Sequence, residues 1–396
     1  MKRLVVCCDG TWGAESNPSV SNVVKIAESL RLNTSEADGR MVEQQVFYTD
    51  GPGTRGYSAD KILGGMFGVG LDSALSTLYW QLALNWEPDD EIFLFGFSRG
   101  AYLARSLSGL INRIGLLTPD ALSEGRLPDA LAIFRQRKAH PDDPDPAQWV
   151  QFREQYCRAP VPIKFLGVFD TVGAMGVPGI TSGKYRFHDL RLAPTVHCAR
   201  QALAIDERRR LYSPCLWEVI DEAGVAEQWP DRVKQVWFEG CHTDIGGGLP
   251  DGRLSDRTLR WMVREACEQG LEIDRDRLEE SIAHSATATG PVRPHSTLNL
   301  FYRIANLVGL LVHPRDTRFY RDSWRRLDAR PDQRVYLASC ACGDSEYDPP
   351  NVRRWARDCD DCVPTEQTTG HVESVAETEK LAAADGAATT SEEVTA

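Results

Sequence analysis

One stretch, Glu91 to Arg105, constrains the fold of this chain more than any other part of the sequence. It runs from a short apolar strand through a Gly-x-Ser-x-Gly turn into the start of a helix. Such a turn holds its serine, here Ser98, in a strained backbone conformation, so the residues two before and two after it must be small. Gly96 and Gly100 meet this requirement. The pattern predicts a nucleophile elbow at the end of a buried strand in a parallel sheet.

Four further segments share the form of that strand, an apolar run that ends in a polar or glycine-rich turn. They are Leu4 to Asp9, Gln45 to Asp50, Ile163 to Asp170 and Val233 to His242. Helical patterns lie between them, at Asn22 to Leu32, Leu71 to Asn85, Ala101 to Arg113 and His197 to Arg210. Strands that alternate with helices indicate βαβ units. The sequence therefore predicts an α/β fold with an α/β-hydrolase-like, mostly parallel sheet and helices on both faces.

The chain is predicted to divide into a catalytic domain and two C-terminal segments. We expect the catalytic domain over residues 1–275, with a proline- and acid-rich insertion at about 120–155. Residues 276–362 show no clear strand alternation and predict a helical extension or cap over the carboxyl edge of the sheet. Residues 363–396 contain seven acidic residues, one lysine and no Phe, Trp or Tyr. This composition predicts a disordered acidic tail.

Composition limits the classes of partner and the compartment. The formal net charge of -12 argues against general nucleic-acid binding. The apolar run after Lys2 and Arg3 is too short for a secretory signal, and no apolar stretch reaches the roughly 18 residues of a membrane span. The 11 cysteines are scattered, which suits a reducing compartment. We expect a cytoplasmic protein, with export by a machine that needs no signal peptide as the alternative, and the oligomeric state stays open.

The chemistry of a serine nucleophile requires a base and a carboxylate that orients the base. Asp170 and His242 both end predicted strands, and they follow Ser98 in the order Ser, acid, His of α/β-hydrolases. The glycine run Gly246 to Gly248 after the histidine indicates a close approach of the backbone to a ligand or side chain. We predict Ser98 as nucleophile, Asp170 as acid and His242 as base, with Asp244 as a rival acid.

Further polar groups at the strand ends are candidates for supporting roles. Asp9 and Asp50 follow predicted strands and are alternative or supporting acids. An oxyanion hole needs at least two donors. The N–H of Arg99, at the start of the helix after the elbow, is one candidate, and the N–H of Gly10 or Thr11 is the second.

A set of four cysteines near the C-terminus has the residue type, but only part of the spacing, of a structural zinc site. The set is Cys340, Cys342, Cys359 and Cys362, and one residue rather than two to four separates the first pair. Reduced surface thiols are the favoured interpretation. We expect no cofactor and no catalytic metal.

Six ordered motifs together point to a known family. They are Cys8 to Trp12, Thr49 to Thr54, Gly96 to Tyr102, Phe169 to Gly173, Ala204 to Glu207 and Gly240 to Gly248. The set resembles the α/β-hydrolase catalytic domain of the type VI secretion phospholipase effectors, over roughly residues 2–264. The resemblance implies a serine esterase that acts on lipid or phospholipid esters through an acyl-enzyme, with Ser98, Asp170 and His242 as its triad. A housekeeping cytoplasmic esterase is equally compatible with the motifs.

Two other functions stay open at this point. Cys7 to Thr11 is similar to the Asp-x-Asp-Gly-Thr signature of haloacid-dehalogenase-like enzymes, which implies a metal-dependent phosphohydrolase. Cys7, however, stands where that signature has its nucleophilic aspartate. The third candidate is a non-catalytic α/β interaction module, for which the strand-end residues would have no chemical role.

The apolar segment Leu298 to Val312 has two interpretations. A core helix is favoured, because helical apolar stripes mostly face cores. The alternative is a lid or a lipid-contacting helix beside the site, which would give a peripheral membrane contact. The expected partner in either case is a small-molecule or lipid ester substrate.

Overall fold

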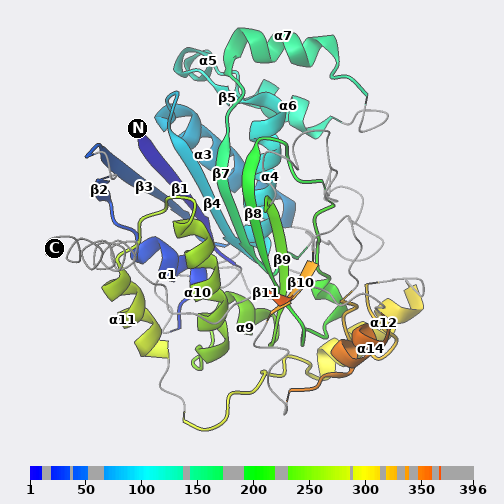
Figure 1. Cartoon of the computed structure of the whole chain (residues 1–396). Coiled ribbons are helices and arrows are strands. Elements are labelled where there is room, and N and C mark those ends of the chain that lie inside the picture. The colour runs from blue at the N-terminus through cyan, green and yellow to red at the C-terminus, as the bar shows by residue number, and fades with distance from the viewer. Residues whose placement is uncertain are drawn as a thin grey trace, which may run out of the picture.

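The protein is organised around one large sheet, whose labelled strands lie side by side in Figure 1. The computed structural model describes residues 1–10, 19–35, 39–51, 67–136, 143–172, 191–218, 231–285, 289–312, 318–327, 335–338, 347–358 and 365–366. Within these residues the sheet has nine strands in the order β11-β10-β9-β8-β7-β4-β1-β3-β2. Strand β2 pairs antiparallel with β3, and the other pairs are parallel. The carboxyl ends of the parallel strands therefore share one edge.

The strands that build this sheet are β1 (Lys2–Cys8), β2 (Asn33–Ser35), β3 (Met41–Thr49), β4 (Glu91–Phe97), β7 (Ile163–Phe169), β8 (Val196–Ala204), β9 (Val233–Phe238), β10 (Val335–Ala338) and β11 (Thr365–Glu366). The helices around it are α1 (Asn22–Glu28), α3 (Phe67–Asn85), α4 (Arg99–Ile114), α9 (His242–Gly246), α10 (Arg253–Cys267), α11 (Arg275–Ser285), α12 (Leu300–Val312) and α14 (Pro350–Asp358), with a 3-10 turn η1 (Arg210–Tyr212). The predicted α/β fold class is confirmed.

Helices cover both faces of the sheet because its strands are apolar on both faces. Leu4 and Val6 of β1 belong to a buried cluster with residues of α3 and α4. Val5 and Cys7 belong to a second cluster, with residues of α1, α10 and α11. Alternate side chains of a strand point to opposite faces, so β1 lies between the two helical layers. This arrangement leaves the carboxyl edge of the sheet as the place for a site.

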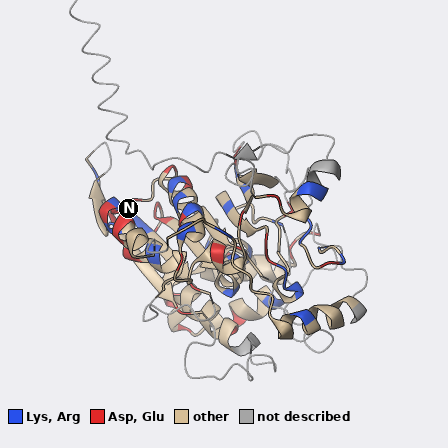
Figure 2. Cartoon of the chain, turned by 90° about the horizontal axis from the view of Figure 1, so that it is seen from below, with Lys and Arg blue, Asp and Glu red and all other residues tan. Residues whose placement is uncertain are grey.

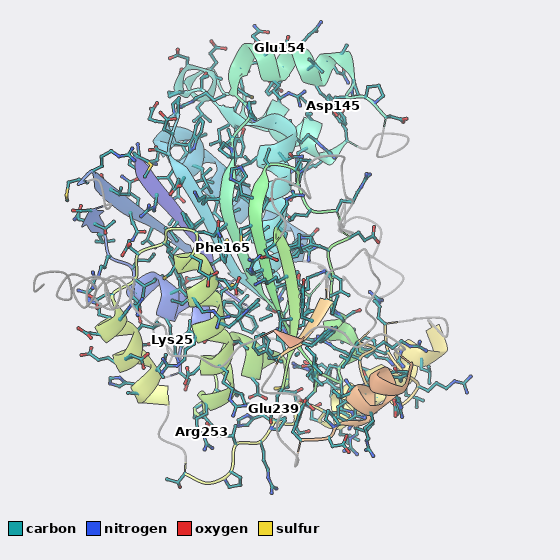
Figure 3. All side chains as sticks on the ribbon, in the orientation of Figure 1. Lys25, Asp145, Glu154, Phe165, Glu239 and Arg253 are labelled. Atoms are coloured by element: carbon teal, nitrogen blue, oxygen red, sulfur yellow. The ribbon has the colours of Figure 1, made fainter. Side chains whose placement is uncertain are left out.

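Close packing at the centre of the sheet depends on a small residue next to a large one. The Phe165 ring on β7, labelled in Figure 3, stacks on Phe93 at a centroid distance of 6.3 Å and lies tilted against Phe95 at 5.5 Å. A side chain at Gly167 would place its Cβ 2.6 Å from Met262 Sδ of α10. The missing side chain thus lets α10 lie directly on β7.

The described residues of the segment predicted as an insertion form helices away from the carboxyl edge. The segment contains α5 (Pro119–Ser123), α6 (Leu127–Arg135) and α7 (Ala147–Tyr156), with the short pair β5 (Leu116–Leu117) and β6 (Cys157–Arg158) beside it. In Figure 1 these elements lie at the end of the sheet opposite α9. They therefore take no part in the site described below.

One secondary-structure prediction was wrong. The segment His197 to Arg210, predicted as a helix, contains β8 instead, which lies between β7 and β9. Its Ala, Arg, Gln and Leu residues favour helices, but tertiary packing overrides such propensities. Here the buried Arg200 of β8 bonds the buried Glu265 of α10, which satisfies a charge that would be costly inside a strand.

The segment 276–362, predicted as helical, also contributes a strand to the sheet. Val335 and Leu337 of β10 pack in a buried cluster with Trp237 of β9 and Leu203 of β8. Without β10, the edge of β9 would present unpaired backbone groups, and the short apolar run of β10 pairs with them. Of the predicted acidic tail only Thr365 and Glu366 are described, and they pair with β10 as β11. The rest of that prediction lies outside the described residues.

Among the described helices, none combines the length and the apolar character needed to cross a membrane. Figure 2 shows basic and acidic residues interspersed over the described part of the chain.

Candidate active site

The turn between β4 and α4 has the geometry that the sequence predicts. Ser98 lies at φ 57° and ψ −115°, in a region that L residues rarely adopt. Its N–H donates to the Phe169 carbonyl of β7 at 3.0 Å, which ties the turn to the neighbouring strand. A Cβ at Gly96 would lie 2.6 Å from Ala101 Cα, and one at Gly100 would lie 2.1 Å from the Cys8 carbonyl oxygen. Only glycine fits at these two positions, because the elbow packs directly against β1 and its own helix.

The structure brings Ser98, His242 and Asp170 together in a hydrogen-bonded relay. His242 Nε2 lies 2.8 Å from Ser98 Oγ, and His242 Nδ1 lies 2.6 Å from Asp170 Oδ2. All three side chains are buried. Asp170 follows β7 and His242 begins α9, so both lie at the carboxyl edge of the sheet, as predicted. A carboxylate on Nδ1–H leaves Nε2 free to accept a proton from the serine.

His242 is held between two aromatic rings. The Phe97 ring lies 4.8 Å from the imidazole and the Tyr212 ring lies 4.9 Å from it, in an edge-on contact. The His242 backbone N–H donates to Glu207 Oε2 at 3.3 Å. Burial lowers the pKa of His242, although Asp170 acts in the opposite direction. The imidazole is therefore kept in the neutral form that a general base requires.

The glycine run after His242 allows α9 to lie against the elbow strand. A Cβ at Gly246 would lie 2.0 Å from the ring of Phe97. Gly247 and Gly248 follow with φ values of 84° and 99°. The glycine run therefore lets the backbone lie against the Phe97 side chain and then turn with positive φ. The sequence predicted such a close approach of the backbone.

Asp244, the rival acid, has other partners. Its Oδ2 accepts the Cys241 N–H at 2.9 Å and the His295 N–H at 2.9 Å, and its Oδ1 lies 2.7 Å from His295 Nδ1. It therefore caps α9 and anchors the segment that leads to α12. The carboxylate placed against His242 is that of Asp170.

The other strand-end aspartates lie beside the site without touching the relay in any described contact. Asp9 is buried and accepts from Tyr48 Oη at 2.8 Å and from the Gly10 N–H at 2.6 Å. Burial raises the pKa of Asp9. Asp50 directly follows β3, the neighbour of β1.

The predicted oxyanion donors differ in their availability. Arg99 is the first residue of α4, so its N–H lies at the positive end of the helix dipole. Its guanidinium lies near Tyr212 and Tyr302, and burial lowers the pKa of Arg99 to about 10. The Gly10 N–H is bonded to the Asp9 carboxylate in this structure, and Thr11 lies outside the described residues.

Two arginine–carboxylate pairs flank His242, and sequence reasoning found neither arginine. Arg325 binds Asp170 through both terminal nitrogens, at 2.7 and 3.0 Å. Arg209 binds Glu207 at 2.7 Å and stacks 3.6 Å above the Tyr212 ring. Glu207 belongs to a motif that the sequence did single out. Arg325, in contrast, lies in a run of arginines with no spacing that would mark one of them.

The predicted zinc ligands, Cys340, Cys342, Cys359 and Cys362, lie outside the described residues. Within the described ranges, no group of three or more His, Cys, Asp or Glu side chains is arranged to hold a metal ion. The cysteines of those ranges are free thiols.

Large parts of this chain are similar to known proteins. An uncharacterised protein of Saccharomyces cerevisiae, YEL023C, is 29% identical over 227 residues, which cover 52% of this chain and 31% of the yeast protein. A solved structure of the Tle1 effector bound to the VgrG spike from the type 6 secretion system is 19% identical, covers 64% of this chain and 52% of its own, and has a TM-score of 0.35. An uncharacterised protein from Pseudomonas aeruginosa is 16% identical, covers 74% of this chain and 51% of its own, and has a TM-score of 0.38.

The chain thus spans about a third of the yeast relative and about half of each solved structure. Residues 2–265 match the family described as the catalytic domain of Tle1-like phospholipase effectors of type VI secretion. The matched range contains the elbow, both strand-end partners of Ser98 and the glycine run. The chain belongs to the Tle1-like phospholipase effector catalytic domain family.

Proposed function

We propose that the protein is a serine hydrolase that cleaves carboxylic esters of lipids through Ser98, His242 and Asp170. The observation that carries this proposal is the relay from Ser98 Oγ to His242 Nε2, at 2.8 Å, and from His242 Nδ1 to Asp170 Oδ2, at 2.6 Å. Nucleophile, base and acid lie within hydrogen-bond distance in the order that acyl transfer requires. The strained backbone at Ser98 directs the serine hydroxyl toward His242.

The reaction proceeds in two halves. His242 Nε2 takes the proton of Ser98 Oγ while that oxygen attacks the ester carbonyl carbon. Asp170 holds the Nδ1–H and stabilises the imidazolium that forms. The tetrahedral intermediate collapses, the alcohol leaves with the proton from His242, and an acyl-enzyme is left on Ser98. His242 then takes a proton from a water molecule that attacks the acyl-enzyme carbonyl, and the second tetrahedral intermediate collapses to the acid as His242 returns the proton to Ser98 Oγ.

The negative oxygen of the intermediate needs donors at the start of α4. The Arg99 N–H, at the positive end of the helix, supplies the first. A second donor from the Gly10 N–H requires that the Asp9 carboxylate gives up its present 2.6 Å bond. One such donor typically contributes about 3 to 4 kcal/mol to the transition state.

The strand β1 gives less support to a phosphohydrolase. Cys7, which stands at the position of that family's nucleophilic aspartate, is fully buried, and burial raises its pKa above the usual range of thiols. Asp9, two residues on, is also buried and bonded to Tyr48. Neither group presents the accessible carboxylate nucleophile that the mechanism would use.

Two observations support a lipid rather than a small soluble ester. The first is membership of a family described as phospholipase effectors. The second is the outward face of α12, whose large apolar side chains have exposed fractions between 52% and 74%. These residues are Leu300, Phe301, Ile304, Leu307 and Val308. Residues at these spacings form one face of a helix. Large exposed apolar patches of this kind mark surfaces that bind other apolar matter.

The opposite face of α12 is fixed close to His242. Asn306 accepts the Arg210 N–H at 2.9 Å and donates to the Arg208 carbonyl at 2.8 Å. The Tyr302 ring lies 6.2 Å from the ring of Tyr212, which in turn contacts His242. These contacts hold α12 beside the site, which supports a contact of its apolar face with lipid near Ser98.

Exposed arginines lie on α12 and on a neighbouring segment. Arg303 on α12 is exposed, as are Arg318, Arg321 and Arg326 on the segment that Arg210 ties to the helix. A helix with an exposed apolar face and with arginines on it and on the neighbouring segment matches the surface of an anionic phospholipid membrane. We therefore propose a peripheral membrane contact through α12. Export by a type VI secretion system follows from the family alone and is proposed on that basis.

The function is tested by ester hydrolysis with the full chain and its Ser98→Ala variant. We expect the wild type to cleave p-nitrophenyl esters and phospholipids, and the variant to be slower by at least about 10³-fold, since loss of a serine nucleophile costs that much or more. Equal turnover by the two proteins would contradict the proposal. Magnesium-dependent cleavage of a phosphate monoester by Ser98→Ala would favour the phosphohydrolase instead.

A further inference from the structure

The carboxylate of Asp170 accepts more hydrogen bonds than orientation of His242 requires. Its Oδ1 accepts from the Ala204 N–H at 3.1 Å and from Arg325 Nη1 at 2.7 Å. Its Oδ2 lies 2.6 Å from His242 Nδ1 and accepts from Arg325 Nη2 at 3.0 Å. Each carboxylate oxygen thus takes part in two hydrogen bonds, and together these bonds fix the orientation of the carboxylate.

Arg325 is itself held from three sides. It is completely buried, and it donates to the Ala204 carbonyl at 3.0 Å and to the Tyr212 carbonyl at 2.5 Å. The backbone carbonyl of Arg325 accepts from the Asn351 side chain at 3.3 Å, which connects it to α14. The guanidinium is therefore held by the end of β8 and by η1, and the Arg325 backbone is held by α14. A planar fork fixed in this way is suited to bidentate carboxylate binding.

The charges around His242 are balanced in pairs. Asp170 is paired with Arg325, and Glu207, which accepts the His242 N–H, is paired with Arg209. Among the described residues, Tyr212 also contacts the imidazole and lies near Arg99, while Cys241 and Asp244 cap the helix that His242 begins. Asp244 faces His295 instead of the imidazole. A free carboxylate beside an imidazole favours the imidazolium, and the guanidinium opposes that effect.

We propose that Arg325 is a positioning residue of the ester hydrolysis: it fixes Asp170 against His242 and offsets the carboxylate charge, so that His242 stays neutral and ready to accept the Ser98 proton. This inference rests on the proposed function. It assigns a role in the reaction to residue 325, which lies outside the range 2–265 that matches the family. The direction of two pKa values agrees with it. Burial alone would raise the pKa of Asp170, but Arg325 and His242 bring it well below its usual range, while burial lowers the pKa of His242.

The test compares Arg325→Gln, which removes the charge, with Arg325→Lys, which keeps it. The readouts are kcat/KM for a p-nitrophenyl ester and the rate at which a fluorophosphonate labels Ser98, each measured against pH. In Arg325→Gln we expect the acidic limb of both profiles to move to higher pH by about one unit, the order expected when a buried charge next to a coupled pair is lost. In Arg325→Lys the limb stays where it is in the wild type, while the rate falls at every pH because the fork is lost.

A role in packing alone would lower the rate of Arg325→Gln at every pH and leave its acidic limb in place, and that result would overturn the inference. If Arg325→Gln does not fold, the wild type still tests the neutral state of His242 that the inference requires. Nitrogen NMR of the histidine-labelled protein should show His242 as a neutral imidazole with its proton on Nδ1, titrating below the ordinary value of about 6.5. Titration at or above that value would overturn the inference as well.

The two proposals fail in different ways. If the wild type neither cleaves esters nor reacts with the fluorophosphonate, the proposed function is wrong. If the wild type does both, and Arg325→Gln has the wild-type limb, only the role of Arg325 is wrong.

Discussion

Two parts of the chain meet at His242 and differ in what they contribute. Residues 2–265, the range that matches the family, supply the three members of the relay from the ends of β4 and β7 and from the start of α9. Residues 289–358 supply groups around the relay, among them Arg325 against Asp170, His295 against Asp244 and the exposed face of α12. The proposed bond-making groups thus come from a rigid sheet, whereas their charge balance and surface contacts come from a later segment.

The largest effect is expected at Asp170, which both parts share. In Asp170→Asn the side chain no longer offers His242 Nδ1–H a carboxylate, and the tautomer that leaves Nε2 free is lost. We expect kcat to fall by about 10⁴-fold, as a triad with the wrong tautomer does. The free energy of unfolding should also fall by about 3 to 5 kcal/mol, because Arg325 is left buried without its counter-charge.

Asp244→Asn is the matched control, since Asp244 lies two residues from His242 but bonds His295. We expect less than a tenfold change in kcat. The assay temperature is chosen from thermal denaturation curves so that both variants are folded. A larger loss for Asp244→Asn than for Asp170→Asn would exchange the roles of the two acids.

The next effect tests the rigidity of the sheet part. Gly100→Ala would place a Cβ 2.1 Å from the Cys8 carbonyl oxygen, so the elbow must shift. We expect about a 100-fold loss of kcat, the cost of moving a reacting group by about 1 Å. Gly109→Ala on the same helix places its Cβ 3.7 Å from the Phe134 ring, an ordinary contact. It should keep its activity and gain up to about 1 kcal/mol in helix stability. Similar behaviour of the two variants would contradict the packing argument.

A smaller effect separates the apolar face of α12 from other exposed apolar residues. Leu307→Asp should lower the rate on micellar phospholipid by about tenfold and leave the rate on a soluble ester unchanged, because it removes about 1.5 kcal/mol or more of apolar contact with lipid. Leu84→Asp on α3, where Leu84 is 40% exposed, is the matched control and should change neither rate. Equal losses on both substrates for Leu307→Asp would indicate a role in folding instead.

The smallest effect is a dependence of stability on pH. The pKa of His242 is lowered in the folded state by burial, so the unfolded chain binds more protons than the folded one below about pH 6.5. The free energy of unfolding should therefore decrease as the pH falls through that value, and Asp170, whose pKa is also lowered, adds a further decrease only below about pH 4. The free energy of unfolding, measured by denaturant titration at several pH values between 7 and 5, should depend less steeply on pH for His242→Gln than for the wild type. Parallel slopes would mean that His242 titrates alike in both states.

The sequence predicted the sheet part well because its signals are local. A strand, a small-residue turn and a helix follow one another at Ser98, Asp170 directly follows β7, and His242 begins α9 shortly after β9. It failed at β8, whose Arg200 and Gln201 favour a helix until Glu265 and the neighbouring strands are in place. It also missed Arg325, because the bond to Asp170 joins residues 155 positions apart and nothing near Arg325 distinguishes it from Arg326.

The relay itself is tested most directly by the reaction of the full chain with a fluorophosphonate, followed by mass spectrometry of the labelled peptide. We expect one adduct, on Ser98, formed rapidly by the wild type, much more slowly by Asp170→Asn, and not by the heat-denatured protein. Absence of an adduct on Ser98 in the folded wild type, or labelling that is equally fast after denaturation, would contradict the account of this site.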